Sequence, residues 1–308
     1  MDFGTGWMAD PTIFDTFRQL RDIYRDAPQP RPYQPQVAII TDEDSFFYLR
    51  HSNEITTQSV SLQRRLFNTC GCPVGLYLMS DLCEGRVPAS VRLCVMLNAY
   101  RVTAEQRAQL RKQLARSGKT VVWLYAPGFI KESASAENVS DLIGFRVAEL
   151  GPGLSSVVEV LPTAPPLAAL AGHAFGPEAK PKPLFAVAPE QAGVLALGHY
   201  RGTDQVALAM KQADGWTSVF CGGLQVSAEV LRELARAAGA HVWCHSNDVI
   251  SACPGFVSIH ATADGDKELL MPAPSGLRDL VTGEKLPARA SHRLAMKKGE
   301  TRLFAITP

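Results

Sequence analysis

Residues 91–130, VRLCVMLNAYRVTAEQRAQLRKQLARSGKTVVWLYAPGFI, contain the pattern that decides the fold. Two short apolar runs, residues 93–97 and 121–125, flank a charged segment. Continuous apolar runs of this length are typical of strands that are buried on both faces. Between the two runs, Thr103 and Gln106 have the spacing of a capping box that begins a helix, and Gly118 ends it. The stretch therefore predicts a strand–helix–strand unit of a parallel sheet with a right-handed crossover.

The composition is that of an ordinary globular protein of about two domains. The chain has 308 residues, of which 46% are hydrophobic and 20% are charged, and these proportions are typical of folded soluble domains. A net charge of +1 gives no electrostatic reason to bind nucleic acid or an anionic membrane surface. No stretch approaches the ~18 apolar residues of a membrane span, and the first residues lack the layout of a signal peptide. We therefore expect a cytoplasmic protein without nucleic-acid or membrane partners.

The cysteines point to reduced thiols. There are seven, an odd number, and Cys94, Cys221 and Cys244 lie in or directly after apolar runs, where free cysteines are usually buried. The Cys70-Gly71-Cys72 sequence is too tight for a Cys-x-x-Cys redox motif and has no second pair at zinc spacing. No metal and no cofactor are expected.

The first 34 residues are predicted to lie outside the main domain. Apolar residues within positions 11–25 have helical spacing, and the proline-rich residues 28–36 are typical of a stiff, extended linker. This helix has no core of its own. We expect it either to pack on another part of the protein or to flank the following domain.

Residues 35–246 are predicted to form an α/β domain. The expected elements are strands at 37–40, 74–79, 93–97 and 121–125, helices at 53–69 and 103–117, an antiparallel excursion at 145–161, a hairpin turn at Asp214-Gly215 and a second strand–helix–strand unit over 217–244. The Pro-, Ala- and Gly-rich residues 162–183 are interpreted as a connector within this domain. From Asn247 onward, short apolar runs alternate with Asp-Gly, Pro, Thr-Gly and Lys-Gly turns, which predicts a small antiparallel β-sandwich over 247–308.

Several of these stretches resemble one family. LNAYRVTAEQR (97–107), followed by GKTVVWLYAPGFI (118–130), is similar to the amidotransferase-like trimerisation domain of family-42 β-galactosidases and related bacterial glycosidase-like proteins. VSIHATADGDKELLMP (257–272) and LRDLVTGE (277–284) resemble their C-terminal β domain. The resemblance implies a flavodoxin-like, class I glutamine amidotransferase-like parallel sheet with helices on both faces. It also implies assembly into a homotrimer, and an N-terminal helix equivalent to the last helix of a catalytic barrel.

The resemblance does not extend to the nucleophile of the amidotransferases. In amidotransferase-like domains the turn after a central strand carries a cysteine or serine, whereas the corresponding turn here is Tyr125-Ala126-Pro127-Gly128. Ala126 has no nucleophilic atom, so we interpret this as a degenerate nucleophile-elbow position. The alternative thiol site combines Cys221, at the end of a predicted strand, with His241.

Polar residues follow several predicted strands at their carboxyl ends, where open α/β sheets bind their ligands. The candidate ligand crevice consists of Asp44, Ser45, Asp81, Asn98, Tyr100 and Tyr125. Acids, amides and tyrosines could hydrogen-bond the hydroxyl groups of a sugar. The alternative interpretation is that these residues cap helices and shape loops.

The expected function follows from what the chain lacks. A retaining glycosidase needs two carboxyl groups ~5 Å apart, and in family 42 these belong to a TIM barrel for which this chain has no room. We expect a non-catalytic accessory and oligomerisation region that associates with itself and with a glycosidase barrel, upstream or in trans. An apolar patch of several hundred Å² on the α/β domain would be its physical signature. The alternatives are a hydrolase acting on a carbohydrate or amide at the crevice, and a carbohydrate-binding module.

Overall fold

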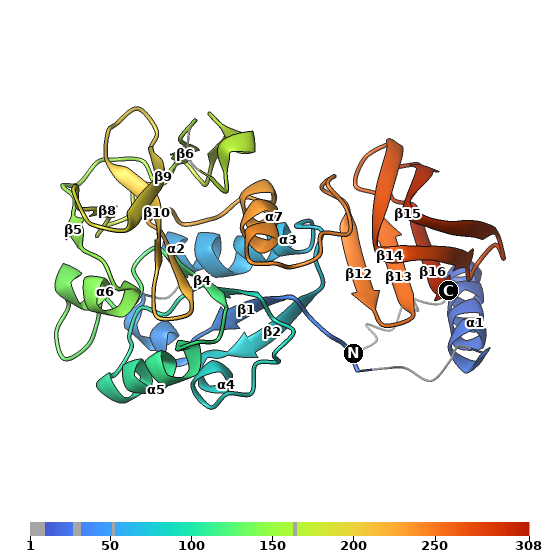
Figure 1. Ribbon diagram of the computed structural model, residues 1–308, viewed down its shortest axis with the longest axis horizontal. Helices are drawn as coiled ribbons and strands as arrows, with labels where there is room; N and C mark the ends of the chain where they lie inside the picture. The colour runs from blue at the N-terminus through green and yellow to red at the C-terminus, as the bar shows by residue number, and fades with distance from the viewer. Residues whose placement is uncertain (1–9, 27–31, 51–52, 163–164, 308) are drawn as a thin grey trace. The chain divides into compact units, whose positions relative to one another are not determined.

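The computed structural model describes residues 10–26, 32–50, 53–162 and 165–307. The chain divides into two compact units (Figure 1): residues 34–250 form one, and residues 251–308 form the other together with the N-terminal residues up to 33. The first is an α/β unit and the second is rich in β-structure. Within the described ranges, none of the helices is both long enough and apolar enough to cross a membrane.

A nine-stranded mixed sheet forms the centre of the α/β unit, in the order β2-β1-β3-β4-β11-β10-β9-β6-β7. The parallel strands are β1 (Val37–Thr41), β2 (Val74–Leu78), β3 (Leu93–Met96), β4 (Thr120–Leu124) and β11 (Thr217–Cys221). The antiparallel strands are β10 (Val206–Gln212), β9 (Val194–Tyr200), β6 (Val158–Val160) and β7 (Ala174–Phe175). Every residue of β3 and β4 is buried, which explains why their sequences are continuously apolar.

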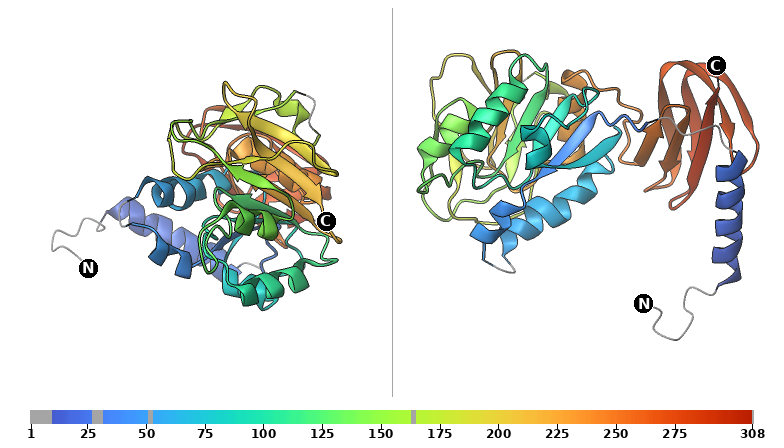
Figure 2. Two further views of the ribbon diagram at one scale, coloured as in Figure 1. Left: turned by 90° about the vertical axis from the view of Figure 1, so that its left-hand side faces the viewer. Right: turned by 90° about the horizontal axis from the view of Figure 1, so that it is seen from below.

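Helices cover both faces of the parallel strands. They are α2 (Glu54–Thr56), the π-helical η2 (Thr57–Leu62), α3 (Gln63–Phe67), α4 (Met79–Cys83), α5 (Ala104–Leu114), α6 (Ala136–Ile143) and α7 (Ala228–Ala237). α4 packs with α5 on one face, and α3 packs with α7 on the other (Figure 1, Figure 2). The predicted capping box begins α5: the Gln106 N–H donates to Thr103 Oγ1 (3.2 Å), and the Thr103 N–H donates to Gln106 Oε1 (2.9 Å). The strand–helix–strand prediction for residues 91–130 is therefore confirmed.

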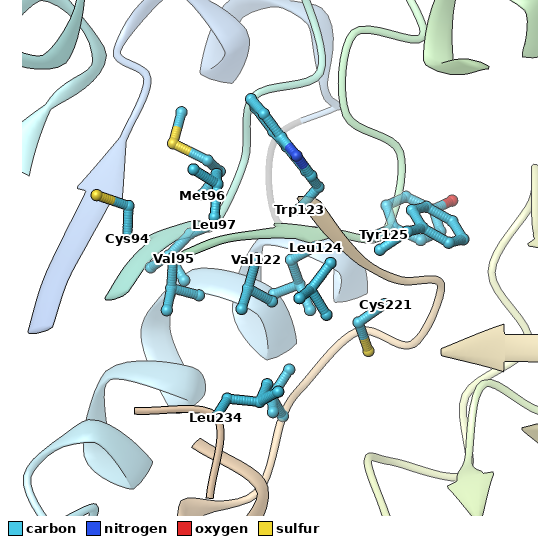
Figure 3. Packing of buried hydrophobic residues seen from close by; sticks show 14 of the residues in the cluster. Cys94, Val95, Met96, Leu97, Val122, Trp123, Leu124, Tyr125, Cys221 and Leu234 are labelled. Atoms are coloured by element: carbon cyan, nitrogen blue, oxygen red, sulfur yellow. The ribbon is translucent and has the colours of Figure 1, made fainter. Parts of the chain in front are cut away.

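The core of the α/β unit is centred on β3, β4 and β11 (Figure 3). Trp123 is among the largest fully buried side chains, and its indole N–H donates to Ser218 Oγ at 3.1 Å. This hydrogen bond joins β4 to β11 inside the core. It satisfies the one polar atom of the indole, which would otherwise destabilise so deeply buried a position.

The second predicted strand–helix–strand unit is only half correct. β11 and α7 form as expected, but residues 241–244 form no strand. In the sheet, β11 is flanked on one side by β4 and on the other by the antiparallel β10, so no strand can be added beside it. Val242, Trp243 and Cys244 are buried by a different contact, in which the Trp243 N–H donates to the Gly71 carbonyl (2.8 Å). The Asp214-Gly215 hairpin is confirmed, because β10 and β11 pair antiparallel on either side of it.

The stretch between α6 and β9 is more regular than a connector. β5 (Val147–Glu149) pairs antiparallel with β8 (Phe185–Val187) in a separate small sheet, and β6 adds antiparallel to the main sheet. Both observations confirm the predicted antiparallel excursion. The predicted connector at 162–183 includes a 3₁₀ turn, η3 (Ala168–Leu170), and β7, which extends the main sheet by pairing with β6. This part of the chain therefore contributes to the sheet instead of only linking two strands.

The β-rich unit contains one five-stranded sheet in the order β12-β13-β16-β14-β15. Its strands are β12 (Val249–Cys253), β13 (Phe256–His260), β14 (Gly265–Asp279), β15 (Lys285–Met296) and β16 (Thr301–Thr307). The short apolar runs separated by turns predicted a small antiparallel β-sandwich, whereas the described residues form this one antiparallel sheet. Pro272 and Pro274 do not end a strand but lie inside β14, where a register shift between Leu270 and Ser275 accommodates them.

The predicted N-terminal helix is present as α1 (Pro11–Asp26) and belongs to the same compact unit as the β14–β15 sheet. Its largest apolar side chains are exposed to solvent: Phe14, Phe17, Leu20 and Tyr24. The helical spacing predicted from the sequence is therefore correct, but in this unit the apolar stripe does not become core.

Candidate functional site

The ends of β1 and β3 are joined by one buried side chain. Asn98, two residues after the end of β3, accepts the Asp42 N–H at Oδ1 (2.8 Å) and donates from Nδ2 to the Asp42 carbonyl (2.8 Å). The side chain is completely buried. Both ends of the Asn98 amide are therefore used to hold two strand ends together, and none of its surface is exposed to a ligand.

The acidic turn after β1 is organised around Asp42 and not around Asp44. Asp42 is buried, and its Oδ2 accepts the Ser45 N–H at 2.9 Å. Ser45 is buried as well, and its Oγ accepts the Arg101 N–H at 3.0 Å. Asp44 is exposed at the start of the 3₁₀ helix η1 (Asp44–Tyr48). Burial raises the pKa of Asp42, and the hydrogen bonds from Ser45 oppose that rise only in part.

The raised pKa of Asp42 makes stability depend on pH. The folded state holds this proton to a higher pH than the unfolded chain does, so the free energy of unfolding decreases as pH rises from about 4 toward 7. Asp42→Asn keeps an acceptor for Ser45 but removes the buried charge. We expect urea unfolding to show a weaker loss of stability over this pH range in the variant than in the parent chain. Asp44→Asn is the matched control on an exposed carboxylate. Parallel stability curves for the parent chain and Asp42→Asn would contradict this assignment.

Both candidate tyrosines belong to the core. The Tyr100 hydroxyl lies 2.8 Å from Ser59 Oγ, and the Tyr125 hydroxyl donates to the Pro183 carbonyl at 2.6 Å. The two rings contact edge-to-face, with centroids 6.0 Å apart. Burial raises the pKa of both hydroxyls, so each remains a protonated group. Neither tyrosine is part of an open crevice.

Asp81 lies in the first turn of α4, where it acts as a cap. Its Oδ2 accepts the Leu78 N–H (2.9 Å), and its Oδ1 pairs with Arg86 Nε (2.8 Å). These two contacts, the first being the larger cause, hold the pKa of Asp81 below its ordinary value. For Ser45, Asp81, Asn98, Tyr100 and Tyr125, the contacts favour the interpretation in which polar residues cap helices and shape loops. Of the six predicted crevice residues, Asp44 alone has an exposed side chain with no such role.

The sharp turn after β4 exists, but its unusual residue is Tyr125. Tyr125 has φ +64°, in the left-handed region that non-glycine residues rarely adopt. It directly precedes Ala126, the position that the sequence suggested as the degenerate elbow. Residues in this conformation are often found at functional sites. Here, however, the phenol is buried against the Pro183 carbonyl, so neither residue of the turn presents a nucleophile.

The structure separates the two members of the alternative thiol site. Cys221 ends β11, and its carbonyl accepts the Tyr125 N–H (2.7 Å) at the carboxyl edge of the sheet. The His241 N–H donates to Gln36 Oε1 (3.1 Å), and Gln36 directly precedes β1, at the opposite edge. Cys221 is buried within the apolar cluster (Figure 3), and burial raises the pKa of its thiol to about 12. These two residues therefore cannot act as a thiol–imidazole pair.

An aromatic face that was not predicted from the sequence lies beside this site. Phe46, Phe47 and Tyr48, the last three residues of η1, are 39%, 86% and 47% exposed. The Arg101 guanidinium lies 5.3 Å from the centroid of the Tyr48 ring. Three consecutive aromatic residues directly after an acidic turn were visible in the sequence. Hydrophobic periodicity does not identify them, because it detects apolar residues on the buried face of a helix or strand.

The fold and the contacts of the strand-end residues together define the class of this protein. This is an α/β protein with a β-rich C-terminal part, in which most of the strand-end polar residues are used by the fold itself. Among the described residues, no group of three or more His, Cys, Asp or Glu side chains is arranged to hold a metal ion. No family model matches the sequence, and no curated protein matches it.

Several solved structures with a similar fold are β-galactosidases. The enzyme from Bacillus circulans sp. alkalophilus matches 96% of this chain with a TM-score of 0.66 at 12% identity. Gan42B, a GH42 β-galactosidase from G. stearothermophilus, matches 95% with a TM-score of 0.65 at 15% identity. The β-galactosidase of the haloarchaeon Halorubrum lacusprofundi matches 92% with a TM-score of 0.60. These matches cover 44%, 43% and 41% of the three β-galactosidase chains, so this chain spans less than half of their length.

Proposed function

We propose that this chain is an accessory region of a glycoside-hydrolase-like protein, which associates with itself and with a glycosidase barrel and has no catalytic role of its own. The observation that carries the proposal is the fold, which nearly the whole chain shares with one part of β-galactosidases. The order of the parallel strands, β2-β1-β3-β4-β11, supports a flavodoxin-like, amidotransferase-like sheet. The trimeric state expected from the family resemblance is part of this proposal.

The local contacts support a role without catalysis. The side chains of Asn98, Ser45 and Tyr125 each form hydrogen bonds with backbone atoms. Cys221 is buried in the core. A hydrolase needs a nucleophile or a pair of carboxyl groups with access to substrate. The strand-end residues offer neither. A hydrolase acting at this crevice is therefore the weaker hypothesis.

The aromatic face is the contact surface that best fits self-association. The exposed parts of Phe46, Phe47 and Tyr48 amount to roughly 300–400 Å², taking ~200 Å² for each aromatic side chain. Phe47 is the most exposed of the three residues, which suits insertion into an apolar pocket of a partner subunit. Aromatic residues and arginine are enriched at the energetic centres of protein interfaces, and Arg101 lies beside this face.

Light scattering over a range of concentrations tests the proposal. We expect a mass close to three times 33.4 kDa that does not change on moderate dilution. Phe47→Glu places a charge at the centre of the aromatic face and should reduce the mass to that of one chain. Leu195→Glu, which alters an exposed apolar residue on β9, is the matched control and should leave the mass unchanged. A parent chain that is monomeric at every concentration would refute self-association.

A further inference from the structure

Strand β15 forms an open edge of the sheet in the β-rich unit. It pairs with β14 on one side, and among the described residues no strand pairs with its other side. In an antiparallel ladder every second residue turns both its N–H and its C=O away from the neighbouring strand. β15 therefore presents a row of unpaired backbone donors and acceptors, which is a template for one further strand.

A groove follows this edge and makes it accessible. It has a volume of about 540 Å³, and its walls consist of residues of β15 between positions 286 and 293. Residues 287–290 are all exposed, and two of them, Ala288 and Ala290, have small side chains that leave the backbone open to approach. A ligand can therefore reach the edge without any opening of the fold.

One buried side chain of the groove fixes the position of β15. His292 is only 4% exposed, and its Nε2 lies 2.9 Å from the Ser275 carbonyl on β14. A carbonyl only accepts hydrogen bonds, so Nε2 is the donor and the ring is held in one orientation. The contact joins the two strands where their register shifts. A strand that is held in place loses little conformational freedom when it binds a partner.

The edge carries three cations and no acid. Lys285, Arg289 and Arg293 are exposed, and β15 contains neither Asp nor Glu. Arg278 on β14 lies directly opposite Lys285, and like charges in this position destabilise a sheet. Glu268 lies opposite Arg293. Even so, in the ranges that the structure describes, none of these cations forms an ion pair with a carboxylate.

Acids elsewhere in this unit are paired with other cations. Asp279 and Glu284 pair with Arg302, and Asp264 pairs with Lys297. The positive charge along β15 is therefore left to be neutralised by a ligand. Charged residues on an edge strand usually keep other strands away. Here the charge has one sign only, so it repels a second copy of β15 and any basic strand, and it favours an acidic one.

We infer that β15 binds an acidic segment of a partner protein, which adds to the sheet as an extended strand. The backbone of the segment pairs with the open edge, and its carboxylates pair with Arg289 and Arg293. These two arginines are four residues apart, which is roughly 13 Å along a strand, and an even separation places them on one face. Acidic residues at alternate positions of an extended peptide have a matching spacing.

The backbone of the edge favours a polypeptide over other polyanions. Strand addition uses N–H and C=O groups that repeat at the spacing of a strand, and sulfated sugars and nucleotides lack them. The main-chain hydrogen bonds supply affinity, and the charges select the sequence. The inference concerns the β-rich unit, so it does not depend on self-association through the aromatic face.

Fluorescence anisotropy with the full chain and a labelled peptide tests the inference. The probe is Thr-Glu-Val-Glu-Val-Glu-Val-Thr with both ends capped, and the control probe has Lys in place of each Glu. We expect the acidic probe alone to bind, with an affinity that falls at least about threefold between low and physiological ionic strength. Equal binding of the two probes, or no binding of the acidic probe at about 1 mM, would overturn the inference.

Methylation of the peptide backbone separates strand addition from simple attraction between charges. A probe that is methylated on every inner backbone nitrogen keeps its carboxylates but loses the donors that a strand needs. We expect its affinity to fall at least about tenfold, which corresponds to one or two hydrogen bonds. Unchanged binding of the methylated probe, or equally tight binding of a heparin oligosaccharide, would show that β15 attracts anions of any kind and would overturn strand addition.

Reversal of charge on β15 locates the site. In Arg289→Glu combined with Arg293→Glu, the acidic probe should bind at least about tenfold more weakly and the basic probe more tightly. Arg64→Glu combined with Arg65→Glu, which alters two exposed arginines of α3, is the matched control and should leave binding unchanged. Hydrogen exchange in residues 288–296 should slow when the acidic probe binds. Equal losses in the two variants, or slower exchange only outside β15, would contradict the assignment.

Discussion

Replacing Arg107 with methionine is expected to lower the free energy of unfolding by about 3 kcal/mol or more. Arg107 lies on α5 and is only 2% exposed. Its guanidinium donates to the Val102 carbonyl (3.1 Å), the Gly128 carbonyl (2.8 Å) and the Asn138 carbonyl (2.8 Å). One side chain thus joins three segments: the start of α5, the turn after β4 and the first half of α6.

The expected loss comes from the carbonyl groups more than from the ion pair. Arg107 also pairs with Asp141 (3.0 Å), but the Asp141 side chain is 52% exposed, so water already stabilises that charge. Methionine retains most of the side-chain volume and removes every donor. The Val102 and Gly128 carbonyls, which accept buried hydrogen bonds from Arg107, would lose those bonds, at about 1–3 kcal/mol for each unsatisfied group.

Arg111→Met is the matched control for this prediction. Arg111 lies one turn further along α5 and pairs with the same carboxylate (2.6 Å), but its side chain is 60% exposed. Exposed ion pairs contribute between about 0 and 1 kcal/mol. Urea denaturation of both variants would measure the difference directly. Equal losses in the two variants would show that Arg107 is not the buried link described here.

Gly71→Ala is expected to cost a comparable amount, about 3 kcal/mol or more. A β-carbon at this position would lie 2.3 Å from the Cys244 carbonyl oxygen, a backbone atom that cannot rotate away. Gly71 also has φ +80°, which costs an alanine about 1–2 kcal/mol by itself. Relief of the overlap requires the Cys70–Cys72 turn to move away from Trp243, whose N–H donates to the Gly71 carbonyl.

Gly144→Ala separates the two causes. Gly144 ends α6 with φ +84°, nearly the same conformation, but a β-carbon there would meet nothing within 4 Å. Its replacement should therefore cost only the conformational strain, about 1–2 kcal/mol. The difference between the two variants in thermal or urea unfolding isolates the steric contact at Gly71. If Gly144→Ala were as damaging as Gly71→Ala, the contact with Cys244 would not be the cause.

The parts of the fold that could be predicted were those determined by burial or by local hydrogen bonds. β3 and β4 are covered on both faces, so their sequences had to be continuously apolar, and the α5 cap needs only Thr103 and Gln106. The strand expected at 241–244 failed for a different reason. The segment is apolar, as predicted, but the position beside β11 is occupied by β10. No local sequence pattern shows which strand pairs with β11.

The candidate site was harder to predict because polar side chains look alike in sequence whether they bind a ligand or the backbone. Asn98 was correctly placed at a strand end, yet its partner Asp42 is 56 residues away. Asp42, the buried acid, was left out of the crevice, whereas the exposed Asp44 was included. The two differ in their surroundings and not in chemical type. Such a difference exists only after β1 and β3 have come together.

The division of the chain into two units has a consequence for its synthesis. The β-rich unit is assembled from both ends of the sequence, residues up to 33 and residues from 251 onward, and the whole α/β unit lies between them. During translation the α/β unit leaves the ribosome complete and can fold as a body. Helix α1 is translated before the strands with which it shares a unit, so it has no sheet to pack on until residues 251–307 have been made. A nascent chain that stalls before residue 251 would therefore display a folded α/β unit and a helix α1 without its sheet, which is a form that chaperones bind.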